Sequence, residues 1–190
     1  MSTKLKVYNA VVLTSLLYGC ETWTVYRRHI SRLEQFHQRS LTAIMRIKWH
    51  DRIPSQEVLD RANTTSIEAK LIQAQLRWTG HVIRMDQNRI PKQLFFGELV
   101  QDNRKQGRPH RRYNDNLKTH IKWADLQSHQ LELAASDRSH WRALTRKASS
   151  SFEADRRQHL AEARERRHRA ASQPPPSTGV PCSTCNCLCS

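Results

Sequence analysis

The sequence has no apolar run long enough to cross a membrane, and it contains little negative charge and few glycines. Its most apolar stretch, residues 10–19, is about half as long as the eighteen or so residues of a spanning helix. The small-residue cleavage site of a signal peptide is also missing, because Tyr18, Cys20 and Glu21 stand where it would be. We therefore expect an intracellular protein with no membrane partner.

Catalytic patterns are missing as well. The five glycines form no phosphate-cradling loop, and the Ser and His residues are dispersed without the context of a catalytic triad. Five cysteines, four of them between positions 182 and 189, make no disulfide framework for a chain of 190 residues. The sequence indicates no active site and no small-molecule substrate, and it predicts reduced cysteines.

The charge that is present is strongly positive. Thirty-two Lys and Arg against 17 Asp and Glu give a formal charge of +15 and a pI near 10.3. Such a surplus predicts a polyanionic partner, of which nucleic acid is the commonest. A membrane surface is the rival polyanion, but no polybasic cluster flanks a lipidation signal. RNA or DNA backbone is therefore the predicted partner.

Residues 66–85 predict a helix with two apolar sides. One stripe consists of Ile67, Leu71, Ala74, Trp78, Val82 and Met85, and the nearly opposite side carries Ile72, Leu76 and Ile83. A surface helix needs only one apolar side, so this pattern predicts a central helix between two layers.

Cations recur every seven residues on two predicted helices. The rows are Lys70, Arg77 and Arg84 within residues 66–85, and Arg32, Arg39 and Arg46 within residues 28–48. Seven residues are close to two helical turns, so each row lies on one side of its helix, with neighbours about 10 Å apart. The rows suit backbone phosphates, although a solvated helix face has the same pattern.

A basic loop at residues 104–112, RKQGRPHRR, is a third candidate. Gly107 and Pro109 restrict its backbone path. Its candidate phosphate ligands are Arg108, Arg111 and Arg112. A flexible, soluble connector is the alternative interpretation. His37, on the apolar stripe of residues 28–48, is interpreted as a core histidine and not as a ligand.

The remaining helices are read from apolar periodicity and caps. Residues 3–18 predict a buried helix, with a strand as the alternative because of their β-branched content. Ser55 is the predicted N-cap of a short helix, Pro91 opens another, and a third begins at Tyr113.

A long helix is predicted from Asp137 to about residue 171. Its last part, residues 152–169, has hardly any apolar stripe, but it places opposite charges four residues apart. These pairs are Glu153 with Arg157, Glu162 with Arg166, and Glu165 with Arg169. They predict a solvated, basic helix.

The predicted fold class is all-α. A helical domain at residues 1–149 is followed by a basic solvated helix at 150–171 and a disordered, Pro-rich tail at 172–190. In the tail, Cys182 and Cys185 supply half of a tetrahedral zinc site, and no second half follows. These two cysteines are the candidate zinc ligands, and no other cofactor is expected.

Five segments in order resemble the region that follows the catalytic palm in reverse transcriptases of LINE-type, non-LTR retrotransposons. They are LYGCETW at 17–23, RLEQFHQRSLTAIMRIKW at 32–49, LRWTGHVIRM at 76–85, GRPHRRYND at 107–115 and DRSHWRALTRKA at 137–148. The resemblance implies a thumb-like helical domain that grips the template–primer duplex. It also implies that the tail holds the first half of a Cys-His zinc knuckle.

The sequence departs from this family at the catalytic centre. The family's active site contains paired aspartates that hold Mg²⁺, and no two aspartates are adjacent in this chain. The resemblance therefore implies a polymerase fragment without catalysis that keeps sequence-tolerant nucleic-acid binding. The alternatives are a helical module whose basic edges bind acidic proteins, and the reading frame of a decayed element without a selected function.

Overall fold

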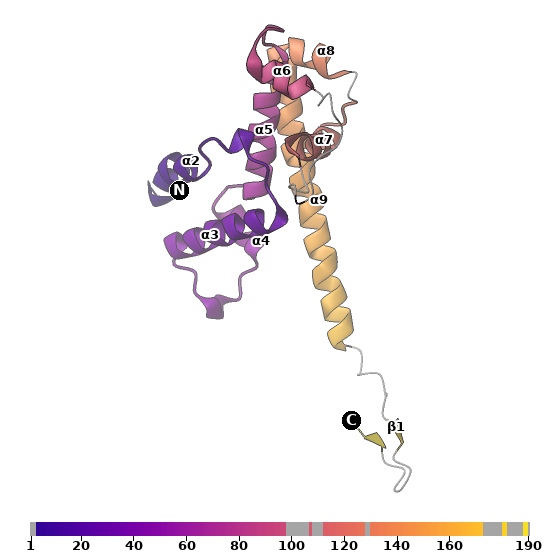
Figure 1. The fold of residues 1–190 in the computed structure, drawn as a ribbon. Helices are drawn as coiled ribbons and strands as arrows, with labels where there is room; N and C mark the ends of the chain where they lie inside the picture. The colour runs from indigo at the N-terminus through magenta and orange to yellow at the C-terminus, as the bar shows by residue number, and fades with distance from the viewer. Residues whose placement is uncertain are drawn as a thin grey trace. The chain divides into compact units, whose positions relative to one another are not determined.

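The computed structural model describes residues 3–97, 107, 112–127, 130–172, 180–181 and 188–189. The described chain is built of helices, which confirms the all-α class (Figure 1). Its one β element is a pair of two-residue strands, β1 (Val180–Pro181) and β2 (Leu188–Cys189), which run antiparallel. The chain divides into two compact units, Met1–Asp155 and Arg156–Ser190. The sequence-based boundary lay after residue 149.

The first helical segment contains a π-helical turn. It runs as α1 (Thr3–Val7), η1 (Tyr8–Val12) and α2 (Leu13–Leu16), so the helix is confirmed and the strand alternative is wrong. The buried side chains Leu5, Tyr8 and Leu13 follow at steps of three and five residues. The longer step fits the wider π turn. Val11 and Val12 are exposed, because this turn shifts the helical phase.

Most of the other helices of the first unit lie close to their predicted positions, but the short helices at residues 20–22, 49–51 and 131–136 were not predicted. In chain order, the helices are η2 (Cys20–Thr22), α3 (Arg27–Met45), η3 (Trp49–Asp51), α4 (Ser55–Arg61), α5 (Ile67–Ile83), α6 (Ile90–Phe96), α7 (Tyr113–Trp123) and α8 (Leu131–Ser136). The last helix is α9 (Arg138–Ser172). One predicted cap is wrong. The carbonyl of Pro54 accepts the first helical bond, from Val58 N–H, so Pro54 is the N-cap and Ser55 lies inside α4.

Helix α5 has two buried sides, as its sequence predicts. Ile67 and Leu71 lie in a core formed with the preceding helices. Ile72 and Leu76 lie in a second core with residues of α7 and α9, while Ile83 joins a third beside α8. The helix is therefore the element around which the first unit is packed.

The first part of α9 packs antiparallel along α5, and the two helices lie side by side in Figure 1. Hydrogen bonds join the two segments: Ser66 Oγ to Glu153 Oε2 at 2.6 Å, Ser149 Oγ to the Ala69 carbonyl at 3.2 Å, and Trp141 Nε1 to the Leu76 carbonyl at 2.9 Å. Glu153 was expected on a solvated face, but it is 5% exposed because it packs against Ser66. We call this contact the α5–α9 seam.

The tryptophan that fills this seam is Trp141, which is 3% exposed. A Cβ atom built on Gly80 would overlap the indole of Trp141. Because glycine has no side chain, α5 and α9 can pack closely at this position. Trp78 was expected to be buried in the stripe of α5. It is only partly buried, and the centre of its ring lies 5.4 Å from that of His81.

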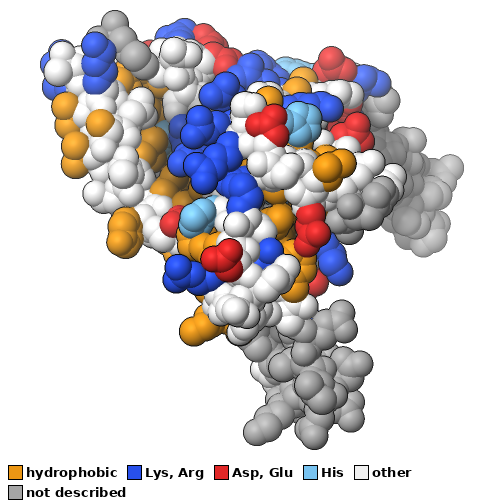
Figure 2. Space-filling view, turned by 90° about the horizontal axis from the view of Figure 1, so that it is seen from above, with side chains coloured by type: hydrophobic (Ala, Val, Ile, Leu, Met, Phe, Trp, Pro, Cys, Tyr) orange, Lys and Arg blue, Asp and Glu red, His pale blue; other side chains and the backbone are white. Residues whose placement is uncertain are grey.

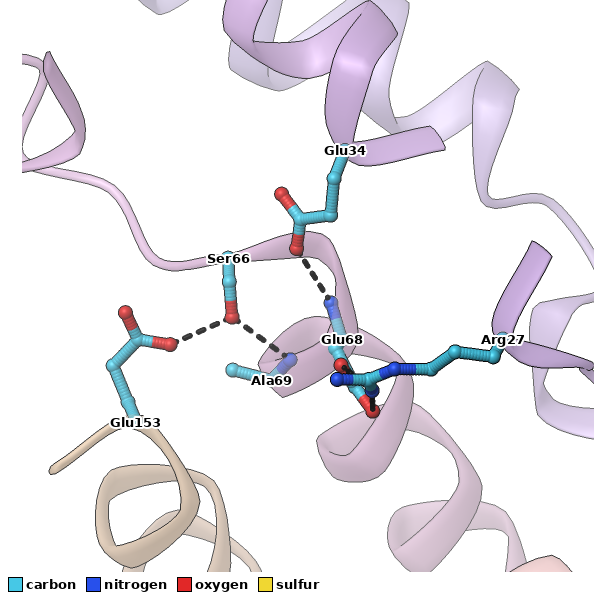
Figure 3. A network of polar contacts seen from close by, with 6 residues as sticks. All are labelled: Arg27, Glu34, Ser66, Glu68, Ala69 and Glu153. Atoms are coloured by element: carbon cyan, nitrogen blue, oxygen red, sulfur yellow. Dashed lines mark hydrogen bonds and ion pairs between the residues drawn. The ribbon is translucent and has the colours of Figure 1, made fainter. Parts of the chain in front are cut away.

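A polar network caps the first turn of α5 (Figure 3). The Ser66 hydroxyl oxygen accepts a hydrogen bond from Ala69 N–H at 3.2 Å. Glu34 of α3 accepts one from Glu68 N–H, also at 3.2 Å. The Glu68 carboxylate binds Arg27 at 2.7 and 2.8 Å. Carboxylates at a helix N-terminus are favoured by the helix dipole, so this network fixes α3 against α5.

The described helix of the second unit, residues 156–172, is largely exposed. The predicted pair of Glu165 with Arg169 is present at 3.1 Å. Glu162 accepts a hydrogen bond from Gln158 at 2.9 Å. Each pair of this kind stabilises a solvated helix by a few tenths of a kcal/mol.

Candidate nucleic-acid interface

The predicted cation row of α5 does not remain together. Arg77 is exposed, whereas Arg84 and Lys70 are half-buried. The Arg84 guanidinium donates from Nη1 to the carbonyl of Ala135 at 2.8 Å. That carbonyl lies in the last turn of α8, where the helix dipole favours a cation. Arg84 is therefore held towards α8 and the start of α9.

Two arginines of α9 join Arg84. Burial lowers the pKa of the Arg84 guanidinium, and the nearby charges of Arg138 and Arg142 lower it further. Both neighbours are exposed on the first turns of α9. Three guanidinium groups from two helices thus lie close enough to repel one another, an arrangement that a bound anion would stabilise.

Arg138 and Arg142 begin a second row, which continues with Arg146. The members are four residues apart, so they lie on one side of α9 with neighbours about 6 Å apart, and all three are exposed. Sequence reasoning missed this row. Its signal was the four-residue spacing, but the importance of the row depends on which helix lies beside it.

The α5–α9 seam brings the two rows together. Trp141 reaches Leu76 and Gly80 on α5, and Arg84 of α5 lies near Arg138 and Arg142 of α9. We call Arg77, Arg84, Arg138, Arg142 and Arg146 the arginine strip. Figure 2 shows a band of Lys and Arg side chains on the face seen from above. Within the described residues, none of the five forms an ion pair.

Lys70 is not part of the strip. Burial lowers the pKa of its ammonium group, and the carboxylates of Glu34 and Glu153 oppose that shift. Its charge lies between two acidic side chains at the N-terminal end of α5. Lys70 therefore balances carboxylates inside the protein, and the heptad prediction misplaced it because those partners come from α3 and α9.

The cation row of α3 ends at the C-terminus of the helix. Arg32 and Arg39 are exposed on the helix. Arg46 is the C-cap, with a left-handed φ of 57°, and its N–H donates to the Ala43 carbonyl at 3.2 Å. This conformation turns the chain out of the helix, so the helix and its cation row end at Arg46, which is exposed.

The basic loop and the zinc candidates are only partly described. Arg112 is exposed at the N-cap of α7, and its N–H donates to the Asp115 carboxylate at 2.9 Å. Arg108, Arg111, Cys182 and Cys185 lie outside the described residues. Among residues that the structure does describe, no group of three or more His, Cys, Asp or Glu side chains is arranged to hold a metal ion.

His37 is a core histidine, as predicted. It is 0% exposed, and its Nδ1 shares a 2.9 Å hydrogen bond with the hydroxyl of Tyr8. Burial, with a smaller contribution from the charge of Lys70, lowers the pKa of His37 to about 4. The ring is therefore neutral at physiological pH and contributes no charge to the surface.

The geometry defines an all-α protein whose central seam carries an arginine strip. Comparisons with known protein families, with curated proteins and with solved structures gave no significant match. Across the described part of the chain, no helix combines the length and the apolarity needed to cross a membrane.

Proposed function

We propose that the chain binds the backbone of duplex RNA or DNA through the arginine strip, without reading base sequence. The observation that carries this proposal is the position of Arg84 on α5 near Arg138 and Arg142, which belong to the arginine row of α9. Guanidinium groups bind phosphate oxygens with two parallel hydrogen bonds, and such contacts carry no sequence information. The row on α9 extends about 12 Å, the axial length of three to four phosphates on one strand.

We further propose that the chain derives from the post-palm region of a LINE-type reverse transcriptase. The strip supports this proposal because its members come from two of the resembling segments. Arg77 and Arg84 belong to LRWTGHVIRM, and the α9 row belongs to DRSHWRALTRKA. Segments more than fifty residues apart thus meet at one basic surface, as expected of a region that grips a template–primer duplex.

The salt dependence of binding tests the first proposal. Each neutralised phosphate contributes about −0.9 to the slope of log affinity against log salt for a duplex, so five contacts give a slope of about −4.5. Fluorescence anisotropy with two unrelated duplexes should give this slope and nearly equal affinities. A flat salt response, or a strong preference for one duplex, would contradict backbone binding.

No polymerase activity is proposed for the chain itself. Two-metal phosphoryl transfer needs clustered carboxylates, and the sequence has no adjacent aspartates. With Mg²⁺ or Mn²⁺, primed template and nucleotides, the purified chain should extend no primer above background. Extension that disappears when one of its aspartates is replaced would contradict this expectation.

A protein-interaction module remains the second candidate. Helix α6 presents Ile90 and Leu94, one turn apart, at 70% and 75% exposure. Exposed aliphatic side chains in a row are common at protein interfaces. Acidic polypeptide separates the two candidates: if polyglutamate binds as tightly as duplex of equal charge, the interaction module is favoured.

A further inference from the structure

An open pocket of about 480 Å³ lies beside the start of α3, away from the residues of the strip. Its lining residues are Trp23, Thr24, Val25, His29, Arg32 and Leu33. Pockets of this size hold small ligands or single groups of larger ones. Most of the lining is apolar, with the positive charge of Arg32 at its edge.

The walls of the pocket are fixed by the fold. The carbonyl of Trp23 accepts a 2.9 Å hydrogen bond from Gln75 of α5, which anchors the segment before α3. Val25 is 7% exposed and belongs to the first core. On the other side, Leu33 of α3 also packs against that core. The pocket is therefore held open between two anchored elements.

The pocket is lined by the rings of Trp23 and His29 and by Arg32, and Tyr26 and Arg28 are close to these residues in the chain. Tyr26 packs edge-on against the His29 ring at 5.7 Å, and the guanidinium of Arg28 lies 5.7 Å from the centre of the Tyr26 ring. Arg28 and Arg32 are both exposed, one turn apart on α3. The acidic side chain of Glu68 lies near this turn and is engaged by Arg27.

The first turn of α3 adds a further preference for anions. It contains no acidic residue, and the side chain of the N-cap, Tyr26, makes no capping hydrogen bond. Free N–H groups and the positive end of the dipole at a helix start attract phosphate. An apolar pocket with aromatic and cationic residues around it fits a ligand that has a flat apolar body and an attached anionic group.

We infer that this pocket holds an unpaired nucleobase of a single strand, with the adjacent phosphate on Arg32 and Arg28. Proteins that bind single strands combine aromatic platforms with cations in this way. The inference rests on the proposed nucleic-acid binding and extends it to a second substrate: duplex backbone lies on the arginine strip, and an unpaired base enters the pocket.

The first test changes the nucleic acid and leaves the protein intact. Anisotropy compares a short single-stranded oligonucleotide with one of equal length in which the central nucleotides are abasic. Both carry the same phosphates, so contact with backbone alone predicts equal affinities. Occupation of the pocket predicts about tenfold weaker binding of the abasic strand. Equal affinities would overturn the inference.

The second test changes the protein. Arg32→Gln should weaken binding of the normal single strand about fivefold, while Lys118→Gln, which removes an exposed charge that does not line the pocket, should not. A 2-aminopurine base in the strand should be quenched by the parent and less by Arg32→Gln. Equal behaviour of the two variants would exclude the pocket.

The strip proposal and the pocket inference can be contradicted independently of each other. The double variant Arg138→Gln with Arg142→Gln should weaken duplex binding and keep the difference between normal and abasic strands. If the unmodified chain does not bind duplex but still binds the normal strand more tightly than the abasic one, the strip proposal is wrong and the pocket stands. If duplex binds and the difference is absent, the pocket inference is wrong and the strip stands. If an apolar peptide displaces the single strand while duplex stays bound, the pocket is a protein-docking site instead.

Discussion

The cation rows of α3 and α5 look alike in the sequence but differ in the folded protein. Both repeat every seven residues. On α3, Arg32 and Arg39 are exposed, and the row stops where the chain turns at Arg46. On α5, Lys70 lies near the carboxylates of Glu34 and Glu153, while Arg84 lies near Arg138 and Arg142 of α9.

This difference shows what a heptad row can and cannot reveal. The spacing fixes which side of a helix carries the charges. It does not determine the charge density of the surface, because that depends on the element packed alongside. The row on α5 becomes part of a dense basic surface only because the α5–α9 seam places a second row beside it. Breaking the seam should therefore separate the two cases.

The largest expected effect comes from Trp141→Ala. The side chain is 3% exposed, and its indole N–H donates to the Leu76 carbonyl at 2.9 Å. Truncation leaves a cavity in the seam and should lower the free energy of unfolding by about 3–5 kcal/mol. Urea unfolding measures this loss, and duplex affinity should fall with it.

Trp78→Ala is the matched control, because it truncates the same type of side chain at a partly buried position of α5. Trp78 is only partly buried, so its truncation should cost clearly less than that of Trp141. A larger loss for Trp78→Ala would mean that the helical phase of α5 is wrong, and the strip would have to be redrawn.

These two tryptophans also show how far the sequence could predict the structure. The two buried sides of α5 follow from periodicity within one helix, and they were predicted. The partner of Trp141 is Gly80, which lies 61 positions earlier in the chain, and no local pattern reports that contact. The strip was missed for the same reason: half of it lies on a helix whose neighbour is unknown until the chain folds.

Acid should lower the free energy of unfolding through the buried ring of His37 on α3. Burial lowers the pKa of His37 from 6.5 to about 4. Between these values the unfolded chain binds a proton at His37 and the folded chain does not, so falling pH favours unfolding. The stability is present above about pH 6.5 and is lost towards pH 4, by up to about 3 kcal/mol for this group.

Urea unfolding at pH 7 and pH 5 measures this response. His37→Gln should be less stable than the parent at pH 7, because the bond to Tyr8 is disturbed, but should lose less on acidification. His120, whose pKa burial also lowers to about 4, leaves part of the response in place. His81→Gln, at an exposed position, should keep the response of the parent. An unchanged acid response in His37→Gln would contradict the assignment.

The smallest effect on stability is expected from two double variants that each lose two positive charges. These variants are also the most direct test of the difference between the two cation rows. One double variant carries Arg138→Gln and Arg142→Gln in the strip, and the other carries Arg32→Gln and Arg39→Gln on α3. All four side chains are exposed, so each variant should unfold within about 0.5 kcal/mol per substitution of the parent.

Binding to blunt duplex should nevertheless differ between the two variants. Losing two phosphate contacts should reduce the salt slope by about 1.8, and only the strip variant should show this reduction. The α3 variant has lost the same net charge, so its affinity should fall only through the weaker long-range field, which salt screens. If both variants lose the same slope, the duplex responds to total charge. The meeting of two rows at the α5–α9 seam would then have no part in binding.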